Sequence, residues 1–303
     1  MRVGIQTAQW GATFEEVLAV WQYAERAGYR SAWLMDHFVP VVAPSTEPML
    51  ESWVTLAALL ARTSTIRGGV LVSANTFRHP ALLAHMAATA DRISGGRLEV
   101  GLGAAWNAEE HVARGIAFPP TGDRMGMLEE ACQVLRLLWT APVADFAGAY
   151  YRLDGATCEP KPVQGRLPLL IGGRGERRTL RAAARYADRW NGSGSVEMLV
   201  HSAAVLREHC AREARNPADV ALTVMNECHV SDDPDDVRAH LEEAARFRRV
   251  SVDDVRERVW VGSPEDVRGQ LAAFADAGFD EAILGLNPPY GARTFEMLDA
   301  VMG

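Results

Sequence analysis

The chain has 303 residues, 48% of them hydrophobic and 23% charged, which suits a folded protein with a large core and excludes a disordered chain. Its formal net charge of −8 disfavours nucleic acid and anionic membranes as partners, and no apolar run is long enough to cross a bilayer. Four cysteines without zinc-ligand spacing, together with an N-terminus unlike a signal peptide, predict a cytoplasmic protein with free thiols and no metal.

Short apolar strands alternate with amphipathic helices along the whole chain. The strands are predicted at residues 3–7, 32–35, 69–73, 98–102, 167–171, 188–190, 220–230 and 282–286. The helices are predicted at residues 13–27, with Thr13 as the N-cap, and at 51–63, 79–93, 121–139, 176–186, 196–214, 235–248 and 264–277, and at the C-terminus. Such alternation implies a parallel sheet, and eight strand–helix units predict a single (β/α)8 TIM barrel over residues 1–303.

One segment interrupts this alternation. Residues 142–168 precede the fifth strand, and the sequence FAGAYYRL within them predicts an inserted β-hairpin with its turn at Ala147 and Gly148. The loops that leave the strand ends are long, notably residues 36–50 and 103–120. Because TIM barrels carry their chemistry at the carboxyl ends of the strands, these loops are expected on the functional side.

The fifth strand ends in a glycine-rich sequence, LLIGGRGERR. Gly172, Gly173 and Gly175 come directly before the helix predicted at 176–186. Glycines let an anion approach the main chain, and the N–H groups at the start of a helix favour negative charge. The alternative is a tight turn that needs glycine for its positive φ angles. The sequence is neither GxGxxG nor a P-loop, so it predicts an anion site without a nucleotide fold.

Two further strand ends carry titratable side chains. Asp36 and His37 follow the second strand, where an imidazole can transfer a proton near neutral pH beside a carboxylate that orients a ligand. A loop cap is the alternative interpretation. The sequence VGLGAAWNAEEH after the fourth strand brings Trp106, Glu109 and His111 to the same side, but it offers too few ligands at telling spacing for a metal site.

Several enzyme classes are disfavoured. The chain has no G-x-S-x-G elbow, and its one lysine, Lys161, lies in the hairpin segment away from the strand ends. A nucleophilic hydrolase and a Schiff-base lyase or isomerase are therefore poorly supported. The remaining site is glycine-walled and aromatic with a place for an anion, which suits a large planar cofactor that carries a phosphate.

Several stretches of the chain are similar to the luciferase-like monooxygenase superfamily, and most to its branch that uses the deazaflavin coenzyme F420. The stretches are LMDHF, TFRHPALLAHMAATADRISGGRLEVGLGAAWNAEEH, GIAFPP, KPVQGRLPLLIGGRGERRTLRAAARYADRWN and GSPEDV. The resemblance implies a bacterial luciferase-like TIM barrel, with the flat ring over the carboxyl ends of the strands and a non-prolyl cis peptide between Leu71 and Val72 behind it.

The resemblance also implies roles for individual residues. Asp36 would meet the polar edge of the ring or its ribityl chain, and His37 would serve as the proton donor or acceptor. Other positions that match cofactor-lining residues are Ala74, Ala104, Ala105 and Glu109. The phosphate would be held by main-chain N–H groups at Gly172, Gly173, Gly175 and Glu176.

The chain departs from the pattern at three positions. Trp106 stands where the sugar-phosphate dehydrogenase of the superfamily has a catalytic Glu, and Ala74 stands where that enzyme has a cofactor-contacting Thr. Glucose 6-phosphate is therefore disfavoured as a substrate. Ala105 replaces the third glycine of the motif GLGAGW.

We therefore expect an oxidoreductase that transfers a hydride between coenzyme F420 and a small organic substrate that the sequence does not identify. The first alternative is an FMN-dependent luciferase-like monooxygenase that uses O2, since both cofactors join a flat ring to a phosphate. A non-catalytic cofactor-binding protein of the same fold is another alternative. Relatives often form dimers, and the sequence is compatible with a homodimer. The expected substrate walls are Gln6, Trp10, Trp106 and residues 39–49 and 287–290.

Overall fold

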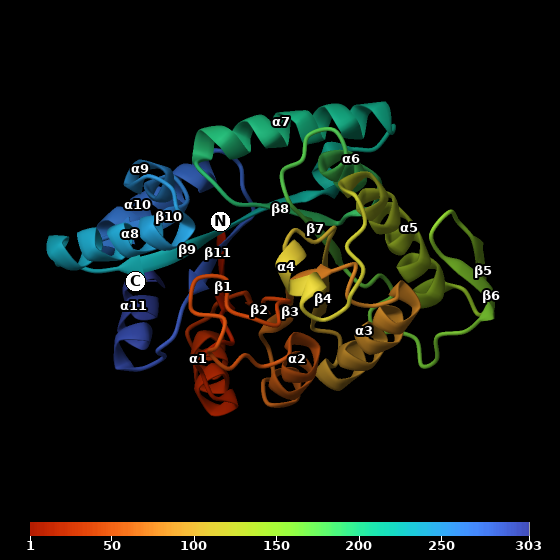
Figure 1. Ribbon diagram of the computed structural model, residues 1–303, viewed down its shortest axis with the longest axis horizontal. Coiled ribbons are helices and arrows are strands. Elements are labelled where there is room, and N and C mark those ends of the chain that lie inside the picture. Colours follow the sequence, from red (N-terminus) through yellow and green to blue (C-terminus); the bar gives the residue numbers. More distant parts are fainter. Residues whose placement is uncertain (303) are drawn as a thin grey trace.

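The computed structural model describes residues 1–302, in which eight parallel strands close a barrel with helices around it (Figure 1). Around the barrel the strands follow the order β9, β11, β1, β2, β3, β4, β7 and β8, and the pairing of β8 with β9 closes the circle. The strands are β1 (Arg2–Thr7), β2 (Ser31–Leu34), β3 (Arg67–Ala74), β4 (Leu98–Gly103), β7 (Leu169–Gly172), β8 (Arg189–Gly192), β9 (Ala221–Val230) and β11 (Glu281–Leu286). The predicted TIM barrel and its eight strands are confirmed.

The helices cover the outside of the barrel. They are α1 (Phe14–Arg26), α2 (Ser52–Ala61), α3 (Pro80–Ser94), α4 (Ala108–Val112), α5 (Thr121–Thr140), α6 (Thr179–Tyr186), α7 (Val196–Arg212), a 3₁₀ turn (Pro217–Asp219), α8 (Pro234–Arg248), α9 (Val252–Arg256), α10 (Pro264–Asp276) and α11 (Ala292–Met302). The predicted N-cap Thr13 is confirmed, because its hydroxyl and the Glu16 carboxylate form a capping box at α1. None of the helices in residues 1–302 combines the length and apolar character that spanning a bilayer requires.

The inserted hairpin is confirmed as well. β5 (Ala144–Ala147) and β6 (Arg152–Ala156) pair antiparallel and project from the edge of the molecule (Figure 1). Ala147 ends β5, and the Gly148 N–H donates to the Tyr151 carbonyl at 2.9 Å, so the turn begins one residue later than predicted.

The short helices α4 and α9 were not predicted, and two further parts of the fold differ from the prediction. β10 (Val259–Gly262) is an additional strand that pairs only with the second half of β9, Glu227–Val230. Its four residues stand between charged segments, too short a run for its pattern to indicate a strand. Helix α6 begins at Thr179 rather than at residue 176, because residues 176–178 form a turn and no side chain caps the helix at Arg178.

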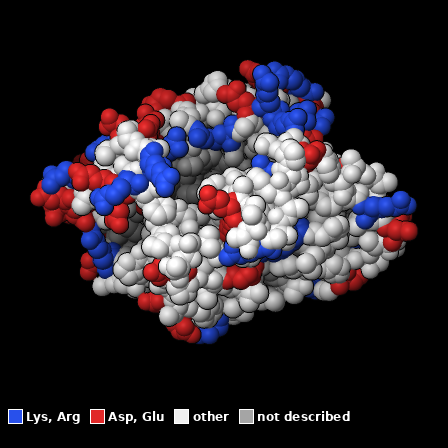
Figure 2. Space-filling view, in the orientation of Figure 1, with Lys and Arg blue, Asp and Glu red and all other residues white. Residues whose placement is uncertain are grey.

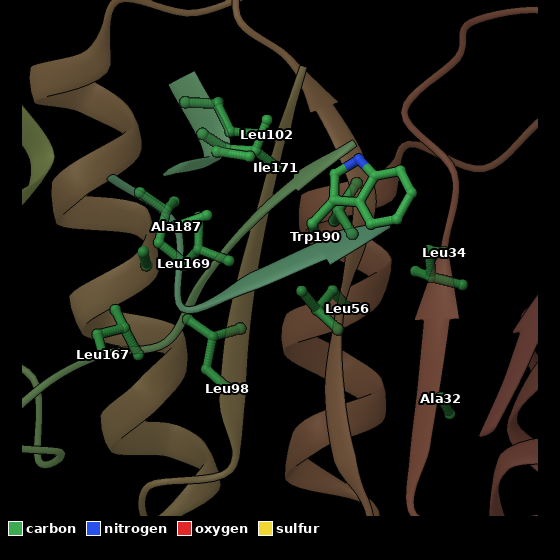
Figure 3. Close-up of a cluster of buried hydrophobic side chains, with 14 of the residues drawn as sticks. Ala32, Leu34, Leu56, Leu98, Leu102, Leu167, Leu169, Ile171, Ala187 and Trp190 are labelled. Carbon is green, nitrogen blue, oxygen red and sulfur yellow. The ribbon is translucent and has the colours of Figure 1, made fainter. Parts of the chain in front are cut away.

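The main core lies between the barrel strands and the surrounding helices. Figure 3 shows part of it, where Leu98, Leu169 and Trp190 come from three different strands. A smaller cluster includes Trp33 and Leu170, which alternate with the helix-facing residues and so fill the inside of the barrel. The barrel is therefore a packed scaffold that holds its strand ends in place.

A buried charge network closes the amino-terminal end of the barrel. Glu99 on β4 and Glu281 on β11 are each at most 1% exposed. Glu99 Oε1 lies 2.6 Å from the guanidinium groups of both Arg30 and Arg67, and Glu281 pairs with Arg30 and Arg189. Burial alone would raise the pKa of Glu99, but the charges of the three arginines outweigh it and hold that pKa below its ordinary value. Glu99 therefore stays ionised inside the protein.

This network predicts a stability effect for Glu99→Gln. Removing one buried carboxylate leaves guanidinium groups uncompensated, which should lower the free energy of unfolding by about 3 kcal/mol at neutral pH. Urea denaturation measures the change. Glu208→Gln is the control, since its ion pair with Arg212 is exposed and should contribute less than about 1 kcal/mol.

The network also predicts how the stability difference between wild type and Glu99→Gln depends on pH. Folding lowers the pKa of Glu99. Its contribution to the free energy of unfolding is therefore fully present above the pKa of the unfolded chain, about 4.3, and is lost as the pH falls through the lower pKa of the folded protein. The stability difference between wild type and Glu99→Gln should therefore shrink in acid. An undiminished difference in acid would contradict this account.

Candidate active site

A cavity of about 720 Å³ opens at the carboxyl ends of the barrel strands, a volume within the range of small-molecule and cofactor sites. Figure 2 shows a hollow near the centre of this view with Lys and Arg side chains along its upper rim. Of the residues expected to form the site, the structure brings these to the cavity wall: Asp36, His37, Leu71, Val72, Ala74, Ala104, Ala105, Gly172 and Gly173. Three others lie outside the lining: Glu109, Gly175 and Glu176.

His37 lies at the cavity wall and is held by a carboxylate. Its Nδ1 is 2.8 Å from Oε2 of Glu110, whose side chain is fully buried. The Glu110 carboxylate also accepts the main-chain N–H groups of Phe38 and Val39. Nε2 of His37 has no partner among residues 1–302 and is the ring nitrogen left for a ligand. The exposed Trp106 lies edge-on to the imidazole, with 5.6 Å between ring centroids.

The surroundings keep Glu110 ionised. Burial would raise the pKa of this carboxyl, but the hydrogen bonds from His37, Phe38 and Val39 outweigh it and lower the pKa below its ordinary value. A carboxylate fixed in this way accepts the Nδ1–H of the imidazole and orients the ring, which leaves Nε2 facing the cavity. The arrangement can therefore take up or release a proton at Nε2.

Glu110 was missed by sequence reasoning, which chose Glu109. Both residues lie in the short helix α4, where Glu109 is exposed and Glu110 is 3% exposed. The segment was expected to be a loop, so the sequence did not indicate which of the two adjacent carboxylates faces inward. Asn107 caps the helix by accepting the Glu110 N–H at 3.2 Å. This capping residue could have indicated a helix here, and with it which of the two carboxylates faces inward.

His111 is structural rather than a metal ligand. Its Nε2 lies 2.6 Å from Oγ1 of Thr76, and its Nδ1 lies 2.7 Å from the carbonyl oxygen of Asn107. Both ring nitrogens are thus engaged by the protein. No group of three or more His, Cys, Asp and Glu side chains with metal-binding geometry occurs in residues 1–302.

Asp36 is buried beside His37 with both carboxylate oxygens occupied. Oδ1 accepts the Ser52 hydroxyl at 2.6 Å, and Oδ2 accepts the Ala74 N–H at 2.9 Å. The Arg78 guanidinium donates to both oxygens, at 2.7 and 3.0 Å. Asp36 thereby joins the ends of β2 and β3, and its expected contact with the cofactor ring stays a prediction.

Val72 forms part of the cavity wall. The peptide bond between Leu71 and Val72 is cis, as the resemblance implies, and the pairing of β3 with β4 shifts its register here. A Cβ at Gly101, Gly103 or Gly172 would come within 3.0 Å of a Val72 methyl group. The glycines of the neighbouring strands β4 and β7 therefore leave room for Val72. Gly172 is needed for this packing, and not for the close approach of an anion that the sequence predicted.

The loop after β7 has a different hydrogen-bond pattern from the one expected. The Gly173 N–H donates to the Asn191 carbonyl at 3.0 Å, so it is not available to a phosphate. The next four N–H groups, at residues 174–177, donate to no acceptor within residues 1–302. Gly173 has a φ of +118° and turns the chain there. Of the four residues with free N–H groups, Arg174 lines the cavity, and residues 175–177 continue from it outside the lining.

Two arginines border this part of the cavity. Arg124 donates to the carbonyl oxygens of Ala104 and Ala105 and so holds the loop after β4, where Ala105 has a φ of +61° in place of the glycine of the related motif. Arg174 follows Gly173 and contacts the Met198 sulfur. Burial and the nearby charge of Arg258 lower the pKa of Arg174.

The barrel and this cavity define an enzyme that binds its ligands at the carboxyl ends of parallel strands. The sequence model of the luciferase-like monooxygenase family matches residues 1–250, and the chain belongs to this family. An uncharacterized protein of Mycobacterium tuberculosis is 34% identical over 182 residues, which span 55% of this chain and 64% of that protein. The match thus covers slightly less than two thirds of that relative.

Two further similarities extend over nearly the whole chain. An F420-dependent glucose-6-phosphate dehydrogenase of Kineococcus radiotolerans is 27% identical over 286 residues, 86% of this chain and 83% of that one. An F420-dependent secondary alcohol dehydrogenase, solved with an F420–acetone adduct, aligns with a TM-score of 0.89 at 22% identity and covers 99% of this chain and 97% of its own. This last similarity shows the fold.

The backbone at Gly173 yields a testable prediction. An added Cβ would lie 3.2 Å from Cγ2 of Thr179, and the φ of +118° is unfavourable for any other residue. Gly173→Ala should therefore lower the free energy of unfolding by about 1–2 kcal/mol, measured by urea denaturation. Gly165→Ala is the control, because no atom lies within 4 Å of the position that its added methyl group would take and its φ is ordinary. Equal stability of the two variants would show that the loop tolerates a side chain.

Proposed function

We propose that this protein is an oxidoreductase that transfers a hydride between coenzyme F420 and a small organic substrate. The observation that carries the proposal is the imidazole of His37, which is fixed at Nδ1 by buried Glu110 and leaves Nε2 at the cavity. The F420-dependent relatives support the choice of cofactor. When bound, F420 supplies a carbon centre that accepts or donates a hydride.

The residues present fit such a group. Val72 and the neighbouring glycines form a wall without protruding side chains, on which a flat ring can lie. The free N–H groups of residues 174–177, next to the Arg174 guanidinium, offer donors for a phosphate. We therefore assign the ring to the wall at Val72 and the phosphate to the loop after β7, with residues 174–177 in place of the N–H of Gly173.

His37 handles the proton that must accompany hydride transfer. When a substrate alcohol is oxidised, its hydroxyl proton has to leave, and Nε2 of His37 can accept it. Glu110 remains a carboxylate throughout, because its pKa is lowered, and it stabilises the imidazolium that forms. In the reverse direction the same nitrogen donates the proton. Trp106, at the cavity mouth, limits the access of water to this pair.

The cofactor is tested by titrating the purified protein with F420 and, separately, with FMN. We expect saturable, micromolar binding of F420, followed by its fluorescence, and much weaker binding of FMN. Arg174→Met should weaken F420 binding by roughly tenfold, because a charged donor beside the phosphate is lost. Tight binding of FMN alone, with O2 consumption once the flavin is reduced, would replace this proposal by a flavin monooxygenase.

The proton role is tested with His37→Asn. In a panel of primary and secondary alcohols, followed by the loss of F420 absorbance, the variant should lose at least about a hundredfold in kcat. Its Kd for F420 should stay within about twofold of wild type, because the N–H groups assigned to the phosphate are untouched. Glu110→Gln should lower kcat by a smaller factor and change the pH profile. His85→Asn is the control, since His85 is exposed and lies outside the cavity lining. An unaltered kcat in His37→Asn would remove this residue from the mechanism.

A further inference from the structure

A side cavity of about 280 Å³ joins the main cavity and shares Gln6, Met35 and Arg258 with it. Its apolar lining includes Trp10, which is 5% exposed, and Leu286 at the end of β11; polar residues that include Glu227, Arg248 and Asn287 form the rest of the wall. This volume lies at the small end of ligand sites. The side cavity therefore has room for the apolar body of a small substrate next to the reacting group.

The one carboxylate of the side cavity is already neutralised. Glu227 on β9 forms an ion pair with Arg248 and lies 3.3 Å from Nε2 of His240. The Asn287 amide donates to it at 2.9 Å. Both oxygens of Glu227 thus have protein partners, and the charge of Arg248 is cancelled in turn. Neither residue offers a charge to a ligand.

Among the described residues, three arginines of the two cavities have no carboxylate partner. The guanidinium of Arg124 is occupied by the carbonyl oxygens of residues 104, 105 and 119, whereas those of Arg174 and Arg258 bind neither a carboxylate nor a carbonyl of the described chain. Within residues 1–302 the guanidinium of Arg258 has no carboxylate within 4.0 Å and makes no side-chain hydrogen bond; only its main-chain N–H is engaged, with the Val255 carbonyl at 2.8 Å. The carboxylates of the main cavity are unavailable to it, because Asp36 is bound to Arg78 and Glu110 to His37. Arg258 therefore presents to the ligand space a positive charge that no carboxylate of residues 1–302 pairs within 4.0 Å; Asp254 of α9 is close enough to attract it but makes no ion pair with it.

The two arginines without a bound carboxylate or carbonyl belong to different segments of the chain. Arg174 follows Gly173 beside the free N–H groups of the loop after β7 and lines only the main cavity. Arg258 precedes β10 and lines both cavities. Two cations that face one space without an anion repel each other, so each favours a negatively charged ligand group of its own.

We infer that the substrate is a small amphipathic acid, whose apolar body enters the side cavity and whose anionic group, a carboxylate or a phosphate monoester, pairs with Arg258. The inference rests on the proposed function, in which Arg174 serves the cofactor. It adds a specificity-determining residue, because a neutral substrate of the same shape leaves Arg258 without a partner.

The experiment uses matched neutral and anionic probes on the F420-loaded protein. Hexanoate, hexyl phosphate and the neutral hexanamide are titrated by calorimetry, with butanoate and octanoate as length variants. We expect at least one anionic probe to bind roughly tenfold more tightly than hexanamide. The larger gain of hexanoate or of hexyl phosphate tells a carboxylate from a phosphate monoester.

Arg258→Met tests the residue itself, since it keeps the length of the side chain and removes its charge. The preference for anionic probes should disappear in this variant, while its fluorescence titration with F420 stays unchanged. Arg207→Met on the exposed face of α7 is the control for net charge and should keep the preference.

Four results would overturn the inference. They are equal binding of neutral and anionic probes, a preference that survives in Arg258→Met, no saturable binding by any probe, and loss of F420 binding in Arg258→Met with the probe preference intact. A protein that fails to bind F420 is titrated with the probes alone. A charge preference that depends on Arg258 would then stand while the proposed function fails.

Discussion

The packing of Val72 is the constraint on which the cavity depends. Its side chain occupies space that glycines leave free on the two neighbouring strands β4 and β7. A methyl group at any of these positions would push Val72 toward the cavity or separate the strands. The Val72 methyl groups fill the space where side chains at Gly101, Gly103 and Gly172 would lie, and no side chain protrudes from this wall. The adjoining groups, His37 from β2 and the loop after β7, are placed around this wall by the closure of the barrel.

Charges are divided between the two ends of the barrel according to their task. At the amino-terminal end, carboxylates and guanidinium groups neutralise one another inside the protein, and their role is stability. At the carboxyl-terminal end, each carboxylate of the cavities has a protein partner, whereas Arg124, Arg174 and Arg258 have no carboxylate of the described chain within 4.0 Å. The open end therefore holds unpaired positive side chains in a molecule whose net charge is −8.

The sequence predicted the architecture because barrel strands and their helices are encoded locally. Alternating apolar runs indicated all eight barrel strands, and the cap at Thr13 was read from neighbouring residues. What escaped prediction depends on contacts between distant segments. The inward direction of Glu110 is set by the end of β2, and the Gly173 N–H is taken by Asn191 on the next strand. The strand β10 exists only because β9 extends past the closed barrel.

That extension divides β9 into two parts that pair with different strands. Its first residues pair with β8 and β11 and complete the barrel, whereas Glu227–Val230 pair with β10 and carry the segment that holds Arg258. The segment between β9 and β10 packs in a small cluster of its own, which includes Leu241 and Val255, so it can be exchanged or lengthened without reopening the barrel. Through this arrangement a lineage of such proteins could acquire new substrates while it inherits its redox machinery intact.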